Sequence, residues 1–229
     1  IAGDGVEALQ LVRSHVPDII VSDVMMPRMN GYKLCKTIKE DINISHIPVI
    51  MLTARDDRQS QISGYKNGAD GYLSKPFEVE MLMELIRNRL KNREYTKKRY
   101  LNAGLIPTPE ESTISLTDET FLIKLNSIIQ ENIDNTNLGI QFICQEVGLG
   151  RSSLYNKLKA LTGMGANEYI SKLRIEKAIT LISGTDMPFS EIAEKTGFTT
   201  PSYFSTAFKQ YTGETPSQYK ERKNKNYYF

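Results

Sequence analysis

The hydrophobic pattern of the first ninety residues alternates between two periods. Apolar residues recur every three to four positions in three stretches, which predicts amphipathic helices at 5 to 14, 31 to 40 and 78 to 91. Short apolar runs predict strands at 18 to 22, 47 to 52 and 71 to 74. The polar stretch 56 to 67 predicts one more helix. Strands that alternate with helices favour a parallel sheet covered on both faces, so we expect the strands to be buried.

After residue 92 the strand signals stop and the pattern becomes helical. Residues 117 to 133 predict an amphipathic helix with Thr117 as its N-cap. Two later segments, 140 to 163 and 189 to 213, each read as a helix, a glycine-containing turn and a second helix that ends in Thr-Gly. The stretch 166 to 183 predicts a long helix between them. Each of the two segments is therefore a helix-turn-helix candidate.

Composition indicates an ordinary globular chain. It has 229 residues, of which 40% are hydrophobic and 24% charged, enough for one large domain or two small ones. No apolar run approaches the roughly 18 residues of a membrane span, and no signal peptide opens the chain, so we expect a cytoplasmic location. Cys35 and Cys144 are isolated, which argues against a disulfide framework or a zinc site.

The charge of the chain differs by region. Residues 1 to 92 are balanced, whereas residues 137 to 229 hold twelve basic and eight acidic side chains, an excess of +4. Residues 93 to 118 combine charged residues with two prolines and a polar cluster, which is typical of a linker. The positive excess in the last third is a mild indication of a nucleic-acid partner, although a solvated helical face has the same composition.

Three polar residues follow the three predicted strands: Asp23, Thr53 and Lys75. In parallel sheets, ligands gather at the carboxyl ends of the strands, so the fold would bring these side chains together. A carboxylate beside an ammonium and a hydroxyl is a sensible acceptor of a phosphoryl group. The carboxylate attacks, while Lys75 and Thr53 contact the phosphoryl oxygens.

These residues lie in motifs that resemble the receiver domain of response regulators. "DIIVSDVMMPRMNGYKL", "IPVIMLTA" and "GADGYLSKPF" are similar to its third, fourth and fifth strands. The resemblance implies a flavodoxin-like α/β fold in which Asp23 is phosphorylated, Thr53 and Tyr72 are switch residues, and Lys75 is catalytic. It also implies a magnesium ion (Mg) bound by the Asp23 carboxylate and the main-chain carbonyl of Met25.

The sequence departs from the receiver pattern at its start. The family places a pair of acidic residues after its first strand to hold magnesium, and Ile1 corresponds to the end of the second strand. The first strand and first helix, roughly 30 residues by ordinary element lengths, have no counterpart. We therefore expect an incomplete receiver with an incomplete magnesium site, within a longer polypeptide.

The last hundred residues resemble the AraC/XylS-type DNA-binding domain, which is all-α with tandem helix-turn-helix units. The stretch "GFTTPSYFSTAFKQYTGETPSQYK" carries the family's signature residues Gly197, Phe198, Phe204, Phe208, Gly213, Pro216 and Tyr219. In the first unit, Gly150 stands where the family usually has a capping serine.

The resemblance also indicates which side chains face DNA. In the first unit they are Arg151, Ser152, Tyr155 and Asn156, with Lys157 and Lys159 available for phosphates. In the second unit they are Ser202, Ser205 and Thr206, with Lys209 for a phosphate. The two units would occupy adjacent major-groove segments about 34 Å apart.

The sequence thus predicts a phosphorylation-dependent transcriptional regulator of a two-component system and no separate enzyme activity. We expect a receiver over 1 to 92, a linker over 93 to 118 and the DNA-binding domain over 119 to 229. The expected partners are promoter DNA, a histidine kinase as phosphodonor and a second copy in a homodimer, with no small-molecule effector. The arrangement resembles the C-terminal part of a Bacteroides-type hybrid histidine kinase, which would be anchored in the inner membrane.

Two alternatives remain open at this point. A stand-alone response regulator would have the same two domains without a kinase in the same chain. A receiver joined to a protein-interaction module would use the helix-turn-helix units to bind protein, since helical hairpins with a glycine turn also occur in proteins that bind no DNA.

Overall fold

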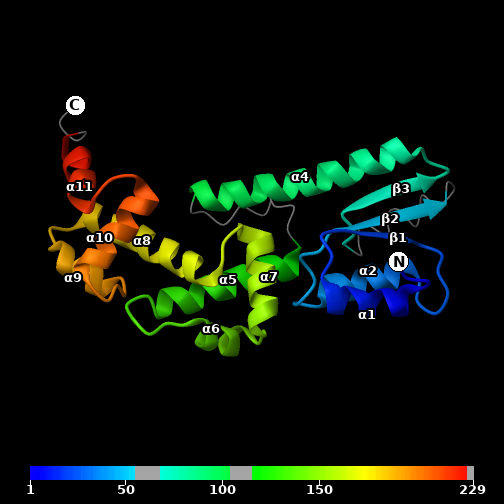
Figure 1. Cartoon of the computed structure of the whole chain (residues 1–229), viewed down its shortest axis with the longest axis horizontal. Helices are drawn as coiled ribbons and strands as arrows, with labels where there is room; N and C mark the ends of the chain where they lie inside the picture. The colour runs from blue at the N-terminus through cyan, green and yellow to red at the C-terminus, as the bar shows by residue number, and fades with distance from the viewer. Residues whose placement is uncertain (55–67, 104–114, 226–229) are drawn as a thin grey trace. The chain divides into compact units, whose positions relative to one another are not determined.

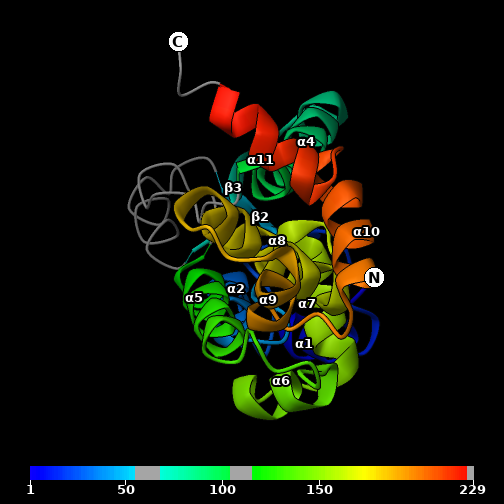
Figure 2. The same cartoon turned by 90° about the vertical axis from the view of Figure 1, so that its left-hand side faces the viewer.

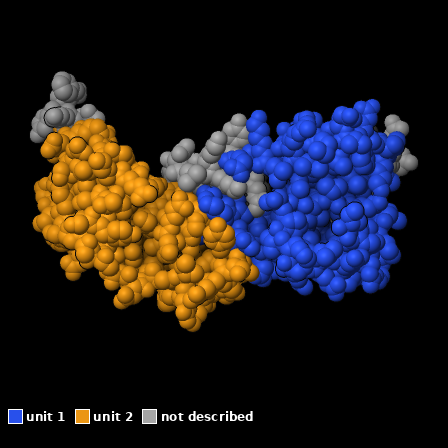
Figure 3. Space-filling view, viewed as in Figure 1, with its two compact units in different colours: residues 1–122, 156–163 blue, residues 123–155, 164–229 orange. Residues whose placement is uncertain are grey.

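The computed structural model describes residues 1 to 54, 68 to 103 and 115 to 225. They form two compact units, shown in different colours in Figure 3. Unit 1 contains residues 1–122 and 156–163, and unit 2 contains residues 123–155 and 164–229. These units are defined by contacts in space, and the domain boundaries at 92 and 118 stay predictions from the sequence.

Unit 1 contains a three-stranded parallel sheet. Strands β1 (Ile20–Asp23), β2 (Val49–Ala54) and β3 (Gly71–Lys75) pair in the order β1-β2-β3. Asp23 lies opposite Leu52, and Ala54 lies opposite Lys75. The three carboxyl ends therefore share one edge of the sheet, as the alternating pattern of the sequence predicts for parallel strands.

Helices cover both faces of this sheet (Figure 1). Helices α1 (Gly5–His15) and α2 (Gly31–Glu40) lie on one face, and α4 (Val79–Ala103) lies on the other. The core beneath α1 and α2 is apolar and buried: Val12, Leu34, Cys35, Ile38, Val49 and Met51. Burying such side chains contributes about 1.5 to 3 kcal/mol each, which is what holds α1 and α2 on the sheet.

Two details of unit 1 differ from the expectation. Val21 is 39% exposed, and within the described residues β1 pairs only with β2, so β1 is a half-buried edge strand of the described sheet. Helix α4 continues to Ala103 and takes in the first part of the expected linker. The charged and aromatic residues of this part include no proline or glycine, so their composition is compatible with a helix as well as with a linker. The expected helix at 56 to 67 and the linker residues 104 to 114 lie outside the described residues.

Helix α5 (Leu116–Glu131) begins earlier than expected. Its first turn is capped by Ser115, whose hydroxyl accepts a hydrogen bond from the Asp118 N–H at 3.2 Å. The expected cap, Thr117, lies inside the helix and donates its hydroxyl proton to the Lys39 carbonyl at 2.8 Å. Thr117 therefore bonds a residue that is remote in the sequence, and nothing in the neighbouring sequence indicates this contact.

The rest of the described chain is helical, and the two expected helix-turn-helix units are present (Figures 1 and 2). The first is α6 (Ile140–Val147) with α7 (Arg151–Thr162), and the second is α9 (Phe189–Lys195) with α10 (Pro201–Thr212). Helix α8 (Ala166–Gly184) connects them, and α11 (Pro216–Lys225) follows. No helix among the described residues combines the length and the apolar character that crossing a membrane requires.

The second helix-turn-helix unit is built on a chain of aromatic contacts. The rings of Phe198 and Phe204 lie 5.3 Å apart, those of Phe204 and Phe208 5.7 Å, and those of Phe208 and Tyr219 5.6 Å. Gly197 makes the turn with φ 71°, and a Cβ at this position would clash with the Ile133 carbonyl. The aromatic core and this turn fix α10 against α8 and α9, which leaves the opposite face of α10 to solvent.

Candidate functional site

The three polar residues predicted at the strand ends lie at the same edge of the sheet. Asp23 ends β1, Lys75 ends β3, and Thr53 is the penultimate residue of β2 between them. The Lys75 ammonium forms an ion pair with the Asp23 carboxylate. The Asp23 and Lys75 side chains are 36% and 44% exposed, so a phosphodonor in solution can reach the carboxylate.

The surroundings of Asp23 keep it ionised. Partial burial of the carboxyl raises its pKa, but hydrogen bonds from the Lys75 ammonium and the Met25 N–H outweigh that effect. The pKa of Asp23 therefore lies below its ordinary value of 3.8. An ionised carboxylate at neutral pH is the nucleophilic form of this group.

The two expected switch residues differ in their burial. The Thr53 side chain is 1% exposed, and its hydroxyl has no hydrogen-bond partner within the part of the chain that the structure describes. A buried hydroxyl without a partner is costly and is often kept for function. Tyr72 is half-buried and packs against the core beneath α1 and α2.

Three residues that the sequence analysis did not single out hold the loop after Asp23. The Gly31 N–H donates to the Val24 carbonyl at 3.0 Å, and a Cβ at Gly31 would clash with the Asp23 carbonyl. Arg28 has a left-handed backbone with φ 59°, and its Nε donates to Asp4 Oδ2 at 2.6 Å. Asp4 could have been found, because an acidic residue before a helix is an N-cap signal, but nothing in the sequence around Arg28 indicates this pairing.

The Asp4 carboxylate also caps the N-terminus of helix α1. Asp4 Oδ1 accepts hydrogen bonds from the Val6 N–H at 2.8 Å and from the Glu7 N–H at 3.1 Å. These bonds and the pairing with Arg28 hold the pKa of Asp4 below its ordinary value, against the opposing effect of burial. The loop that follows Asp23 is thus tied to the N-terminus of α1 through one buried acidic side chain.

The described residues do not complete a magnesium site. The Met25 N–H donates to Asp23 Oδ1 at 3.1 Å, which places the Met25 backbone beside the carboxylate. No group of three or more His, Cys, Asp or Glu side chains that could hold a metal occurs among the described residues. Magnesium prefers six oxygen ligands, so the Asp23 carboxylate and the Met25 carbonyl would supply only part of its shell.

The candidate DNA-facing residues of the second unit lie on the exposed face of α10. Ser202, Thr206 and Lys209 are exposed, and Ser205 is half-buried. A shallow groove of about 530 Å³ follows this face, lined by Ser205, Thr206, Lys209, Gln210, Gly213 and Thr215. Hydroxyls, an amide and one ammonium are groups that donate hydrogen bonds to phosphates and base edges.

Most of the candidates of the first unit are also accessible. Arg151, Ser152, Tyr155 and Lys159 are exposed, with the Tyr155 side chain at 54%, and Asn156 is half-buried. The Arg151 guanidinium donates to Gln141 Oε1 at 3.3 Å, a weak contact at the surface. Ser152, Asn156 and Lys159 share the face of α7 that points away from its buried residues Leu154 and Leu158.

Lys157 contradicts the expectation that it contacts a DNA phosphate. Its side chain is completely buried, and its ammonium is paired with the Asp118 carboxylate. The position is on the inner face of α7, three residues after Leu154 and directly before Leu158. In this structure Lys157 is therefore an internal side chain, and Lys159 is the accessible lysine of the helix.

The sequence matches two family models. Residues 1–87 match the response regulator receiver domain, and residues 143–222 match a helix-turn-helix domain. Among solved structures, the Francisella response regulator 1452 receiver domain is 44% identical, covering 41% of this chain and 74% of that one, with a TM-score of 0.35. The C-terminal domain of AraT, a response regulator from Geobacillus stearothermophilus, is 30% identical, covering 44% and 84%, with a TM-score of 0.42.

Two curated relatives match most of the chain. "Histidine kinase P4" of Formosa agariphila is 42% identical over 221 residues, which are 96% of this chain and 16% of that protein. "Probable transcriptional regulator ycf29" of Pyropia yezoensis is 31% identical over 179 residues, which are 73% of this chain and 81% of that protein. The chain belongs to the response-regulator family, with a receiver domain followed by a helix-turn-helix domain of the AraC type.

Proposed function

We propose that this chain is a transcriptional regulator whose binding to promoter DNA is controlled by a phosphoryl group on Asp23. The observation that carries the proposal is the Asp23–Lys75 ion pair at the strand ends of a receiver sheet, in a chain that also contains two helix-turn-helix units. Receiver and DNA-binding domains together indicate a regulator and give no support to a separate enzymatic activity.

In the proposed reaction an Asp23 oxygen attacks the phosphorus of a phosphohistidine on a histidine kinase. The new O–P bond forms as the P–N bond breaks, the electron pair stays on the imidazole nitrogen, and that nitrogen takes up a proton from water. Lys75 neutralises charge on the transferred phosphoryl, and the Thr53 hydroxyl donates a hydrogen bond to one of its oxygens. Receiver domains generally use magnesium to screen this charge, and we propose Asp23 and the Met25 carbonyl as two of its ligands.

The buried hydroxyl of Thr53, which has no hydrogen-bond partner among the described residues, supports a switch role. A phosphoryl oxygen on Asp23 would give this hydroxyl the acceptor that it lacks in the described structure, and the gain in hydrogen bonding would draw β2 toward the site. We propose that Tyr72 moves further into the core at the same time and that the surface over β3 and α4 changes with it.

A homodimer on that surface is part of the proposal. Val79, Met81 and Met83 of α4 are 67%, 61% and 42% exposed, and apolar exposure of this kind supports an interface. Two chains would place their DNA-reading helices α7 and α10 on repeated sites. We propose no small-molecule effector, because the DNA-binding half is preceded by a receiver.

A second candidate places the same domains at the end of a hybrid kinase. It is favoured by the relative named as a histidine kinase, which matches 96% of this chain with 16% of its own length. The kinase would then be part of the same polypeptide, whose membrane anchor would lie outside the matched region. Sequencing the gene from its start codon decides between the hybrid and a stand-alone regulator.

The phosphoacceptor is tested with Asp23→Asn and a small phosphodonor such as acetyl phosphate. The test uses the intact protein with magnesium, because residues 1 to 229 are expected to hold an incomplete magnesium site. We expect the parent to gain one phosphoryl group by intact mass and the variant to gain none. Asp18→Asn is the matched control, since Asp18 is an exposed carboxylate just before β1. Equal uptake by Asp23→Asn and the parent would overturn the assignment.

A further inference from the structure

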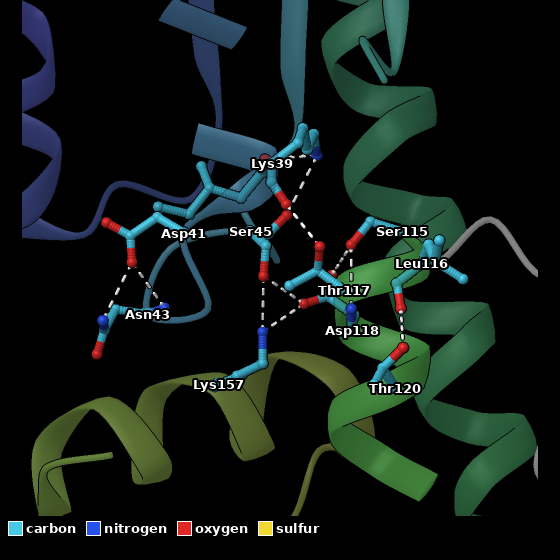
Figure 4. A network of polar contacts seen from close by, with 11 residues as sticks. Lys39, Asp41, Asn43, Ser45, Ser115, Leu116, Thr117, Asp118, Thr120 and Lys157 are labelled. Carbon is cyan, nitrogen blue, oxygen red and sulfur yellow. Dashed lines mark hydrogen bonds and ion pairs between the residues drawn. The ribbon is translucent and has the colours of Figure 1, made fainter. Parts of the chain in front are cut away.

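A network of polar contacts lies in unit 1 beside the loop that precedes β2 (Figure 4). Asp118 and Lys157 form an ion pair whose side chains are 4% and 0% exposed. The Ser45 hydroxyl donates to Asp118 Oδ1 at 2.7 Å and accepts a hydrogen bond from the Lys157 ammonium at 2.7 Å. The Ser115 hydroxyl donates to the other carboxylate oxygen at 2.8 Å. Every member of the network is therefore satisfied by another member.

The Lys157 ammonium has several partners in this arrangement, which oppose the burial that lowers its pKa below the ordinary value of 10.5. It bonds Ser45 and Asp118, and it lies 5.1 Å from the centre of the Phe121 ring, within the range of a cation–π contact. A buried ammonium without such partners would lose its proton or remain in water. The buried position of Lys157 consequently depends on Ser45 and Asp118 being in place.

The three residues come from segments that are remote in the sequence. Ser45 is 73 positions from Asp118 and 112 positions from Lys157. Ser45 lies in the region that matches the receiver family, and Lys157 lies in the region that matches the helix-turn-helix family. The network thus joins the two functional halves of the sequence inside one compact unit.

The loop that carries Ser45 is itself firmly held. The Lys39 ammonium donates to the Ser45 carbonyl at 3.3 Å and to the Ile47 carbonyl at 2.9 Å, and it pairs with Asp70 at 2.8 Å. The Val49 N–H, at the start of β2, donates to Asp70 Oδ2 at 2.7 Å. Because β2 runs from this anchor to Thr53, a shift of the strand moves both the candidate switch residue and the Ser45 loop.

We propose that the receiver loop 41 to 48 is an intramolecular docking surface for the DNA-binding half of this chain, with Lys157 as the side chain that it captures. The loop takes a lysine from the inner face of α7, while the candidate DNA-facing residues Arg151, Ser152 and Tyr155 are exposed. Docking therefore fixes the position of the first DNA-reading helix without covering those side chains. Its regulatory consequence rests on the function proposed above: phosphoryl on Asp23 moves β2, loosens the Ser45 contact and changes DNA affinity.

The docking itself is tested by amide hydrogen exchange on the whole protein, without DNA or phosphodonor. Ser45→Ala should speed exchange in residues 156 to 163 by about tenfold, the effect of losing one hydrogen bond. The double variant Asp118→Asn, Lys157→Met keeps the side-chain shapes and leaves no unpaired charge, and it should speed exchange in residues 41 to 48. Ser14→Ala is the control, since the Ser14 hydroxyl bonds the Gln10 and Leu11 carbonyls of its own helix.

Each variant is read out in the segment that it does not change, which separates docking from a local effect of the substitution. A substitution with only a local effect leaves exchange in the other segment unchanged. Unchanged exchange both in residues 156 to 163 of Ser45→Ala and in residues 41 to 48 of the double variant would overturn the proposal. The regulatory part is tested by the ratio of DNA affinities with and without beryllofluoride, a phosphoryl mimic. We expect a ratio of about fivefold or more in the parent and a ratio within about twofold in Ser45→Ala.

The two proposals fail in different ways. If beryllofluoride has no effect on the parent, the function proposed above is wrong while the exchange result still decides the docking surface. If the parent responds and Ser45→Ala responds equally, the coupling through Ser45 is overturned while the function proposed above stands.

Discussion

Lys75 forms an ion pair with Asp23 although the two residues are 52 positions apart in the sequence. The parallel sheet brings them together, because each ends a strand at the same edge. The pair holds the Asp23 pKa below its ordinary value and places an ammonium where a transferred phosphoryl group would carry negative charge.

Replacing Lys75 by Met should therefore slow phosphoryl uptake from acetyl phosphate by about a hundredfold, the usual effect of losing one charged contact to a transition state. The matched control is Lys36→Met. Lys36 is an exposed lysine of α2 whose only ion pair described here is with Glu40 at 3.8 Å. Single-turnover labelling measures both rates, and equal rates in the two variants would contradict the role of Lys75.

Replacing Thr53 by Val should stabilise the protein by about 1 kcal/mol, because the buried hydroxyl has no partner within the described residues and a methyl group does not need one. The same variant should lose most of its response to phosphorylation. Denaturant unfolding measures the stability, and promoter binding with beryllofluoride measures the response.

Thr162→Val should change the stability in the opposite direction to Thr53→Val. The Thr162 hydroxyl is also fully buried but donates to the Leu158 carbonyl at 2.8 Å, so its removal should destabilise the protein by about 1 kcal/mol. If both variants change stability in the same direction, the hydroxyl of Thr53 is not the unpaired group that the structure indicates.

Two lysines of α7, only two positions apart, should behave differently. Lys157→Ala leaves the Asp118 carboxylate buried without its partner and should cost about 3 to 5 kcal/mol of stability. Lys159→Ala should cost less than about 0.5 kcal/mol, since Lys159 is exposed, but should lower the salt dependence of DNA binding by about one released ion. Comparable destabilisation by both substitutions would contradict the burial of Lys157.

The Asp118–Lys157 pair also predicts how stability depends on pH. Burial raises the pKa of Asp118, but the attraction of Lys157 and the hydrogen bonds outweigh it, so the pKa lies below 3.8. A carboxyl whose pKa is lowered by folding stabilises the protein above its unfolded pKa, and that contribution is lost as the pH falls through the folded value. Asp118→Asn should therefore weaken the dependence of the unfolding midpoint on pH below about pH 4. An unchanged dependence in this pH range would contradict the pairing.

The two cysteines should differ in reactivity. Burial raises the pKa of the Cys35 thiol to about 11, whereas Cys144 is half-buried. Because the thiolate is the reactive form, Cys35 should stay unmodified at pH 8 in the folded protein. A thiol-specific disulfide reagent should label Cys144 first and reach Cys35 only after denaturation, which peptide mapping can follow. Early labelling of Cys35 would show that the core beneath α1 and α2 opens readily.

The sequence predicted the candidate site better than its surroundings. Asp23, Thr53 and Lys75 follow apolar runs, and parallel strands always align their carboxyl ends, so a local pattern was sufficient to bring them together. The pairing of Arg28 with Asp4 and the capture of Lys157 by Ser45 and Asp118 depend on contacts between remote segments. No local period encodes such contacts.

The buried position of Lys157, unlike the identity of its partners, follows from the helical period of the sequence. Leu154, Lys157, Leu158 and Leu161 follow the helical spacing of a single buried face, so the period alone placed Lys157 inside. The length of α4 illustrates the converse: the charged composition after residue 92 is typical of a linker, but residues 93 to 103 contain no proline or glycine, and the helix continues through them.

The most direct test of the account is the affinity of the parent protein and of Asp23→Asn for one promoter fragment, selected from a random-sequence library. Each affinity is measured with and without phosphorylation by acetyl phosphate, at one fixed salt concentration. We predict that phosphorylation changes the affinity of the parent by about fivefold or more and leaves that of Asp23→Asn unchanged. An equal response of the two proteins, or no response in the parent, would contradict control of DNA binding by a phosphoryl group on Asp23.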